Sequence, residues 1–239
     1  MKKFLQKKVK KMKVVILAGG KGSRLSEYTQ NIPKPMVKIL GVPIIERIIK
    51  FYEKYGLKDF IIASGYKSKV IEKYFKRKIK DLNIKVVFTG KDSMTGGRIK
   101  KLRHILNKDK FYLTYGDGLS DVNLNKLLKF HQKNKNFVTL TAVRPPARFG
   151  GIKISGSKVK YFKEKSRLDE GWINGGFFIM EPAIFNFLKN EKTILERYPL
   201  EKISQLKKLG AFKHFGNWQC MDTLRDKIVL EDLVKKNIL

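Results

Sequence analysis

The fold is decided near the start of the chain, by the stretch Val14-Val15-Ile16-Leu17-Ala18-Gly19-Gly20-Lys21-Gly22-Ser23-Arg24-Leu25. A short apolar run that ends in glycines predicts a buried parallel strand followed by a tight turn. Glycines at the carboxyl end of a strand let the backbone approach a ligand, and the exposed amides there can bind phosphate. The stretch is neither a P-loop nor a dinucleotide fingerprint, because Arg24 stands near the place of the third glycine. A plain strand-to-helix turn is the alternative interpretation.

Strands and amphipathic helices alternate along the first half of the chain. Further strands are predicted at 60–63, 84–88 and 111–115, and helices at 43–55, 67–78, 97–106 and 123–135. This alternation predicts a parallel sheet covered by helices on both faces. After residue 137 the predicted strands are closely spaced, at 138–143, 152–154, 159–163 and 176–180, with helices at 182–188, at 200–209 and after residue 221. The second half therefore predicts a smaller antiparallel part.

The composition excludes several classes of protein. The chain has 239 residues, of which 42% are hydrophobic, so it can form a core and is neither disordered nor fibrous. The single cysteine, Cys220, excludes an intramolecular disulfide and fits a reducing, cytoplasmic compartment. No apolar run reaches the roughly 20 residues that a membrane-spanning helix needs.

The formal net charge is +32, from 53 basic and 21 acidic residues. Such a charge suggests a nucleic acid or another anionic partner. The lysines, however, are scattered from Lys2 to Lys236 and heavily outnumber the arginines, which indicates a general composition bias. We therefore expect no nucleic-acid partner and no membrane partner. Residues 1–11 are predicted to be a basic leader that is disordered or that precedes the true start at Met12.

A second loop adds a rigid cation to the glycine turn. In the segment Ile32-Pro33-Lys34-Pro35-Met36, two prolines fix the backbone on either side of Lys34. A rigid lysine and an arginine beside a glycine loop can bind a polyphosphate. At this point the chain resembles the sugar-phosphate nucleotidyltransferases, which join a sugar 1-phosphate to a nucleoside triphosphate.

Three further stretches narrow the resemblance. They are Asp92-Ser93-Met94-Thr95-Gly96-Gly97-Arg98, Thr114-Tyr115-Gly116-Asp117-Gly118 and Trp218-Gln219-Cys220-Met221-Asp222-Thr223-Leu224-Arg225-Asp226. These stretches are similar to the branch of the family that transfers cytidylyl groups to glucose 1-phosphate. The resemblance covers residues 12 to 235.

The resemblance implies a reaction and a set of site residues. A phosphate oxygen of α-D-glucose 1-phosphate would attack the α-phosphorus of CTP, giving CDP-glucose and pyrophosphate, with Mg²⁺ as the cofactor. Lys34, Arg24 and Asp117 would be catalytic, and Asp117 and Asp222 would hold the metal. The implied nucleotide-binding residues are Leu17, Ala18, Gly19, Gly20, Gly22, Ser23, Arg24, Lys34, Ser93, Gly97, Arg98 and Gly116, and the implied sugar-phosphate-binding residues are Glu164, Lys165, Asn174 and Gly175.

The resemblance also implies one Rossmann-like nucleotidyltransferase domain over residues 12–239. Its nucleotide-binding part would span 12–136, its sugar-binding part 137–220 and its C-terminal helix 222–236. We expect a homo-oligomer, although the connection at 76–86 is shorter than in the cytidylyl branch.

Other interpretations stay open on the sequence alone. The same reaction could use another nucleoside triphosphate or another phosphorylated acceptor, and an inactive basic nucleic-acid-binding protein is a third candidate. Among single residues, Asp117 could cap a turn and Asp222 could be a helix N-cap. Arg98 could be a solvated residue in the first turn of a helix, and Lys165 one more surface lysine.

Overall fold

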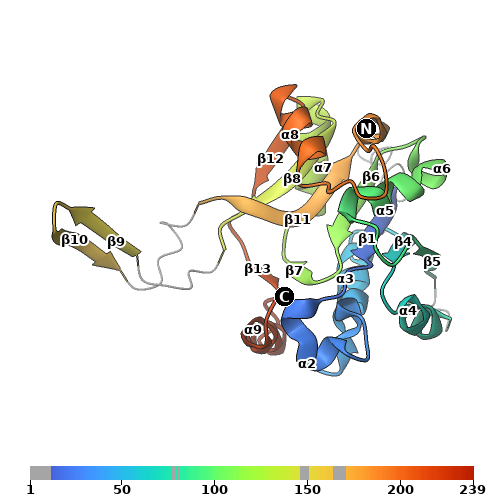
Figure 1. Ribbon diagram of the computed structural model, residues 1–239, viewed down its shortest axis with the longest axis horizontal. Coiled ribbons are helices and arrows are strands. Elements are labelled where there is room, and N and C mark those ends of the chain that lie inside the picture. Colours follow the sequence, from blue (N-terminus) through green and yellow to red (C-terminus); the bar gives the residue numbers. More distant parts are fainter. Residues whose placement is uncertain (1–11, 77–78, 80, 146–150, 164–170) are drawn as a thin grey trace.

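A central sheet organises the molecule. A computed structural model describes residues 12–76, 79, 81–145, 151–163 and 171–239. Seven strands form the sheet in the order β12-β8-β11-β6-β1-β4-β5 (Figure 1). Their bounds are β1 Lys13–Ala18, β4 Asp59–Ser64, β5 Asn83–Phe88, β6 Phe111–Tyr115, β8 Val138–Val143, β11 Ile173–Met180 and β12 Leu209–Lys213. Within this sheet only the pairings of β11 with β6 and β8 are antiparallel, so the predicted mostly parallel sheet is confirmed.

Helices cover both faces of the sheet, as predicted. On one face lie α3 (Ile44–Glu53), α4 (Ser68–Phe75), α7 (Leu124–Asn134) and α9 (Leu224–Lys235), and on the other α5 (Thr95–Lys101), α6 (Arg103–Leu106) and α8 (Tyr198–Gln205). The apolar run of β1 is continuous because both faces of the strand are buried. Val14 and Ile16 belong to one hydrophobic core, whereas Val15 and Leu17 belong to the other. A strand buried on both faces has no polar side to alternate with.

The second half contributes to the central sheet as well as to a separate hairpin. Strands β8 and β11 join the sheet, while β9 (Gly151–Ser155) and β10 (Lys158–Lys163) pair only with each other and project away from the body (Figure 1). The hairpin exposes large apolar side chains, and Ile154 and Phe162 are each 65% exposed. The antiparallel part beside the main sheet is therefore smaller than the strand pattern predicted.

Three predicted helices differ from the observed ones. The helix predicted at 182–188 is a 3-10 helix, η3 (Pro182–Asn186). The helix predicted at 200–209 ends at Gln205, because Lys207 takes a left-handed conformation with φ of 54° and the chain then enters β12. The helix predicted at 97–106 is divided at Leu102, whose ψ of 5° leaves the helical range.

Short elements position the loops around the sheet. They are η1 (Ser23–Leu25), α2 (Ser26–Thr29), η2 (Lys34–Met36), β2 (Lys38–Ile39), β3 (Val42–Pro43), β7 (Gly118–Ser120) and β13 (Trp218–Cys220). The antiparallel pair β7–β13 matters most for the site, because it places Cys220 opposite Gly118. Residues about 100 positions apart in the sequence thereby become neighbours. Across the described ranges, the helices are too short or too polar to cross a bilayer.

Candidate active site

A cleft of about 680 Å³ opens at the carboxyl ends of β1 and β6 and at the start of β11. Ligands of open α/β sheets bind at this edge. Fourteen of the predicted site residues line the cleft, namely Leu17, Ala18, Gly19, Gly20, Gly22, Ser23, Arg24, Lys34, Ser93, Arg98, Gly116, Asp117, Asn174 and Asp222. Gly97 and Gly175 do not line it, and Glu164 and Lys165 fall outside the described residues.

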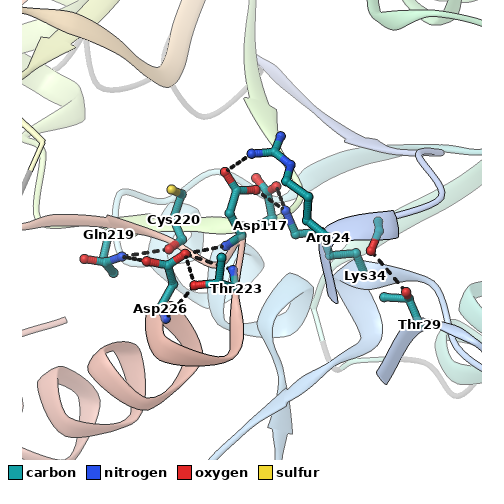
Figure 2. A network of polar contacts seen from close by, with 10 residues as sticks. Arg24, Thr29, Lys34, Asp117, Gln219, Cys220, Thr223 and Asp226 are labelled. Carbon is teal, nitrogen blue, oxygen red and sulfur yellow. Dashed lines mark hydrogen bonds and ion pairs between the residues drawn. The ribbon is translucent and has the colours of Figure 1, made fainter. Parts of the chain in front are cut away.

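Lys34 lies between two carboxylates at the centre of this cleft. Its Nζ donates to Asp117 Oδ2 at 2.7 Å and to Asp222 Oδ1 at 2.6 Å. Arg24 reaches the other oxygen of Asp222, with Nη1 at 3.0 Å from Oδ2. Figure 2 shows Lys34 beside Asp117, with Arg24 next to them. The four groups come from four separate segments, so their convergence is a property of the fold.

The local charges fix the protonation state of Lys34. Burial alone would lower the pKa of the ammonium, but the carboxylates of Asp117 and Asp222 outweigh burial and raise the pKa. Lys34 is therefore a permanent cation at neutral pH. Only 13% of its side chain is exposed, against 76% for Arg24.

The backbone around Lys34 is rigid. Lys34 begins η2, with Pro33 in an extended conformation before it and the buried Pro35 after it. Pro35 packs on Gly116, where an added Cβ would lie 2.9 Å from the proline Cγ. A side chain at position 116 would thus push the lysine loop away from Asp117.

Asp222 is not the N-cap of the last helix. Thr223 is the N-cap of α9, and its side chain and that of Asp226 form a reciprocal capping box. Asp226 also accepts a hydrogen bond from the Asp222 backbone N–H at 3.1 Å. Thr223 and Asp226 cap the helix (Figure 2), and the Asp222 carboxylate instead accepts hydrogen bonds from Lys34 and Arg24.

Asp117 is held by the strand pair next to it. Its carbonyl accepts from the Met221 N–H at 2.8 Å, directly beyond the β7–β13 pairing. Its carboxylate contacts Lys34 and does not cap the Gly118 turn. The Asp117 carboxylate therefore lines the cleft, and its predicted catalytic and metal-binding roles stay predictions.

Arg98 has an unexpected environment. It is 4% exposed, so the interpretation as a solvated helix residue is wrong. Its guanidinium donates to three carbonyl oxygens, those of Ser64, Gly90 and Gly19, at 2.7–3.0 Å, and to Thr89 Oγ1 at 2.9 Å. These bonds tie the glycine turn to the ends of β4 and β5. A Cβ on Gly19 would lie 2.0 Å from the Arg98 Cζ, which explains the glycine there.

Gly97 has a packing role in the structure. A Cβ at this position would lie 2.0 Å from the Glu191 carbonyl oxygen, so α5 approaches the segment before α8 only because the residue is glycine. Gly175 likewise packs on Val143 and accepts from Trp218 Nε1 at 2.7 Å. The predicted contacts of these two glycines with nucleotide and sugar stay predictions.

A second polar network lies where the start of β11 lines the cleft. The Tyr115 hydroxyl donates to Glu196 Oε1 and accepts from Asn174 Nδ2 at 3.1 Å, while Glu196 Oε2 accepts from Thr95 Oγ1 at 2.7 Å. Burial and then the Glu196 carboxylate raise the pKa of Tyr115, so the hydroxyl keeps its proton. Sequence reasoning missed Tyr115 and Glu196 as site residues. Tyr115 could have been found from its place directly before Gly116-Asp117, but Glu196 lies in no motif.

Cys220 also lines the cleft. Burial, followed by the charges of Asp222 and Asp117, raises the pKa of its thiol to about 12. A thiol that stays protonated is a poor nucleophile. Covalent catalysis through Cys220 is therefore not supported.

Comparisons with known proteins identify the family of the chain. A sequence model of the nucleotidyl transferase family matches residues 13–218. The chain belongs to this family. The resemblance read from its motifs is confirmed.

The relatives of this nucleotidyltransferase include enzymes of different base specificity. It is 43% identical to a glucose-1-phosphate cytidylyltransferase of Salmonella typhi, over 94% of this chain and 96% of the relative. It is 34% identical to a D-glycero-alpha-D-manno-heptose 1-phosphate guanylyltransferase of Campylobacter jejuni, over 82% of this chain and 88% of the relative. A solved UDP-glucose pyrophosphorylase bound to UDP-glucose has the same fold, with a TM-score of 0.74 and 19% identity over 95% of this chain and 99% of that one.

Proposed function

We propose that this nucleotidyltransferase transfers the cytidylyl group of CTP to α-D-glucose 1-phosphate, releasing pyrophosphate. The observation that carries the proposal is the convergence of Lys34, Arg24, Asp117 and Asp222 above the glycine turn. The identity of 43% to the Salmonella cytidylyltransferase over nearly the whole chain supports the choice of substrates.

The reaction needs alignment and charge neutralisation. A phosphate oxygen of the sugar phosphate attacks the α-phosphorus, a new P–O bond forms, and the bond to the bridging oxygen of the β-phosphate breaks. The attacking oxygen is already anionic at neutral pH, so no general base is required. Lys34 neutralises charge on the transferred phosphoryl group, and Arg24 binds the departing pyrophosphate.

The acidic pair fits a divalent cation. Asp117 and Asp222 already hold a cation between them, the Lys34 ammonium, and hard carboxylate oxygens are the protein ligands that Mg²⁺ prefers. We propose that these two residues hold Mg²⁺ when nucleotide is bound. Bound there, Mg²⁺ would supply positive charge that offsets the charge of the nucleotide phosphates.

Base and sugar recognition are assigned to opposite ends of the cleft. We assign Ser93, Gly97 and Arg98 to the base side, where Ser93 Oγ donates to the Thr89 carbonyl at 2.6 Å. The buried Arg98 acts there by fixing the glycine turn as much as by reading the base. We assign Asn174, Gly175, Glu164 and Lys165 to the sugar phosphate, with Asn174 held by Tyr115.

We also propose that the enzyme works in the cytoplasm as a homo-oligomer. The exposed apolar side chains of the β9–β10 hairpin support association, because patches of this kind mark interaction sites. Light scattering of the purified chain tests the oligomer, and a monomer at micromolar concentration contradicts it.

The experiment on substrates is a panel of nucleoside triphosphates against several sugar 1-phosphates, followed by pyrophosphate release. We expect CTP with glucose 1-phosphate to give the highest kcat/KM. A higher value for GTP, UTP or dTTP, or for another sugar phosphate, would contradict the assignment while leaving the reaction type intact.

A further inference from the structure

The carboxylates of Asp117 and Asp222 are both paired with the ammonium group of Lys34. Lys34 Nζ lies within 2.7 Å of one oxygen of Asp117 and of one oxygen of Asp222. Arg24 takes the second oxygen of Asp222 at 3.0 Å. The two carboxylates and the two basic groups balance in formal charge, so the pair lacks the negative charge that would attract a metal ion.

A metal ion and the ammonium cannot occupy this place together. Magnesium binds carboxylate oxygens at about 2.0–2.1 Å. An ion at that distance from both carboxylates would be in contact with Lys34 Nζ. The positive charges of the ion and of the ammonium would then repel each other strongly. In addition, no group of three or more histidine, cysteine, aspartate or glutamate side chains that could hold a metal ion occurs among the residues that the structure describes.

We propose that Lys34 is an exchangeable stand-in cation, which keeps the metal out of the unliganded site and leaves the carboxylates only when a triphosphate arrives. This inference rests on the proposed function, since it needs an anionic nucleotide beside the glycine turn. The phosphates supply a new partner for Lys34 and Arg24, and Asp117 and Asp222 then become available to the metal that accompanies the nucleotide. Nucleotide and metal enter together.

The geometry permits the exchange without movement of the backbone. Pro33 and Pro35 fix the main chain at Lys34, so only the flexible four-carbon side chain has to turn. That side chain already lies beside the phosphate-binding turn, because a Cβ added to Gly22 would be 2.9 Å from Lys34 Cβ. Arg24 follows the same turn and is largely exposed, so it too can reorient.

The test measures the affinity for Mn²⁺, a paramagnetic probe, in the absence of nucleotide. Electron paramagnetic resonance gives the concentration of free Mn²⁺. We compare wild type with Lys34→Gln, which removes the stand-in charge, and with Lys38→Gln, a matched change at an exposed lysine outside the cleft. We expect Lys34→Gln to bind Mn²⁺ at least tenfold more tightly than wild type. We expect Lys38→Gln to match wild type.

A second comparison covers the case in which Lys34→Gln does not fold. Wild type and the double variant Asp117→Asn, Asp222→Asn should bind Mn²⁺ equally weakly when nucleotide is absent, because the pair is closed in wild type. A wild type that binds Mn²⁺ tenfold more tightly than the double variant overturns the proposal, as does unchanged affinity in folded Lys34→Gln.

These outcomes are separate from those of the substrate panel. Unchanged Mn²⁺ affinity in Lys34→Gln together with a preference for CTP overturns the exchange alone. Tighter Mn²⁺ binding together with a preference for another nucleotide overturns the proposed substrate alone.

Discussion

Replacing Arg98 by methionine tests whether this residue mainly holds the glycine turn. Methionine keeps most of the apolar stem but removes four short hydrogen bonds, those to Ser64 O, Thr89 Oγ1, Gly90 O and Gly19 O. A hydrogen bond contributes about 1 kcal/mol net, so Arg98→Met should lower the free energy of unfolding by about 4 kcal/mol. For a domain of this size that corresponds to a fall in Tm of roughly 8–16 °C.

The assay is denaturant unfolding followed by circular dichroism, with Arg103→Met as the matched control. Arg103 begins the next helix and is exposed, so its replacement should change the free energy of unfolding by less than about 1 kcal/mol. Arg98→Lys keeps the charge but cannot span the same acceptors, and an intermediate loss is expected. If Arg98→Met is as stable as Arg103→Met and alters only the choice of nucleotide, the residue reads the base and the reasoning from its hydrogen bonds is refuted.

Four further predictions follow from the site and its supports. Asp117→Asn should reduce turnover at least 100-fold, because it removes a charge from the site of phosphoryl transfer. Thermal unfolding should stay nearly unchanged, because Lys34 keeps Asp222 as a partner. Retained turnover in a steady-state assay would show that Asp117 is not catalytic. Tyr115→Phe should raise the KM for glucose 1-phosphate several-fold and leave that for CTP unchanged, since Asn174 and Glu196 lose their shared hydroxyl; equal changes in both KM values would speak against a sugar-side position. Thr223→Ala should destabilise the protein by about 1 kcal/mol through loss of the α9 cap, measured by urea unfolding, and no change would mean that Asp226 alone suffices. The hydrogen bond from His131, together with Lys110 and against the effect of burial, lowers the pKa of Glu181 below its ordinary value of 4.5. The ionised Glu181 therefore stabilises the fold above that pH, and this stabilisation is lost as the pH falls through the lowered pKa. Glu181→Gln should flatten the acid side of a pH–Tm profile, and a profile parallel to that of wild type would contradict this.

The fold was predictable where the local pattern is strong. The run from Val14 to Ala18 is apolar on both faces, because two cores lie on either side of β1, and no half-exposed strand has that pattern. Strand β12 was missed because Leu209–Lys213 contains a glycine and an alanine between lysines, and only its pairing with β8 makes it a strand. Pairing over a long sequence separation leaves no local signal.

In the candidate site, too, the residues with a strong local pattern could be predicted and the others could not. Lys34 and the glycine turn were predictable because rigid backbone and exposed amides are visible in the residue types themselves. The burial of Arg98 was not predictable, since its acceptors include main-chain carbonyls 34 and 79 positions away, and every sequence has carbonyls. Glu196 belongs to the same class, because its partners Tyr115 and Thr95 lie 81 and 101 positions away.

Strand β11 has a consequence for how acceptor choice can diverge. It runs against β6 and β8, so Asn174 enters the cleft from the beginning of a strand, whereas the phosphate-binding turn leaves the end of one. One side of the cleft therefore follows the carboxyl end of β1, and the other side lies at the amino end of the antiparallel strand β11. Under the proposed function, substitutions at residues 173–174 should alter which sugar phosphate is accepted while Lys34, Arg24, Asp117 and Asp222 keep their positions, so the acceptor and the nucleotide are chosen by separate parts of the chain.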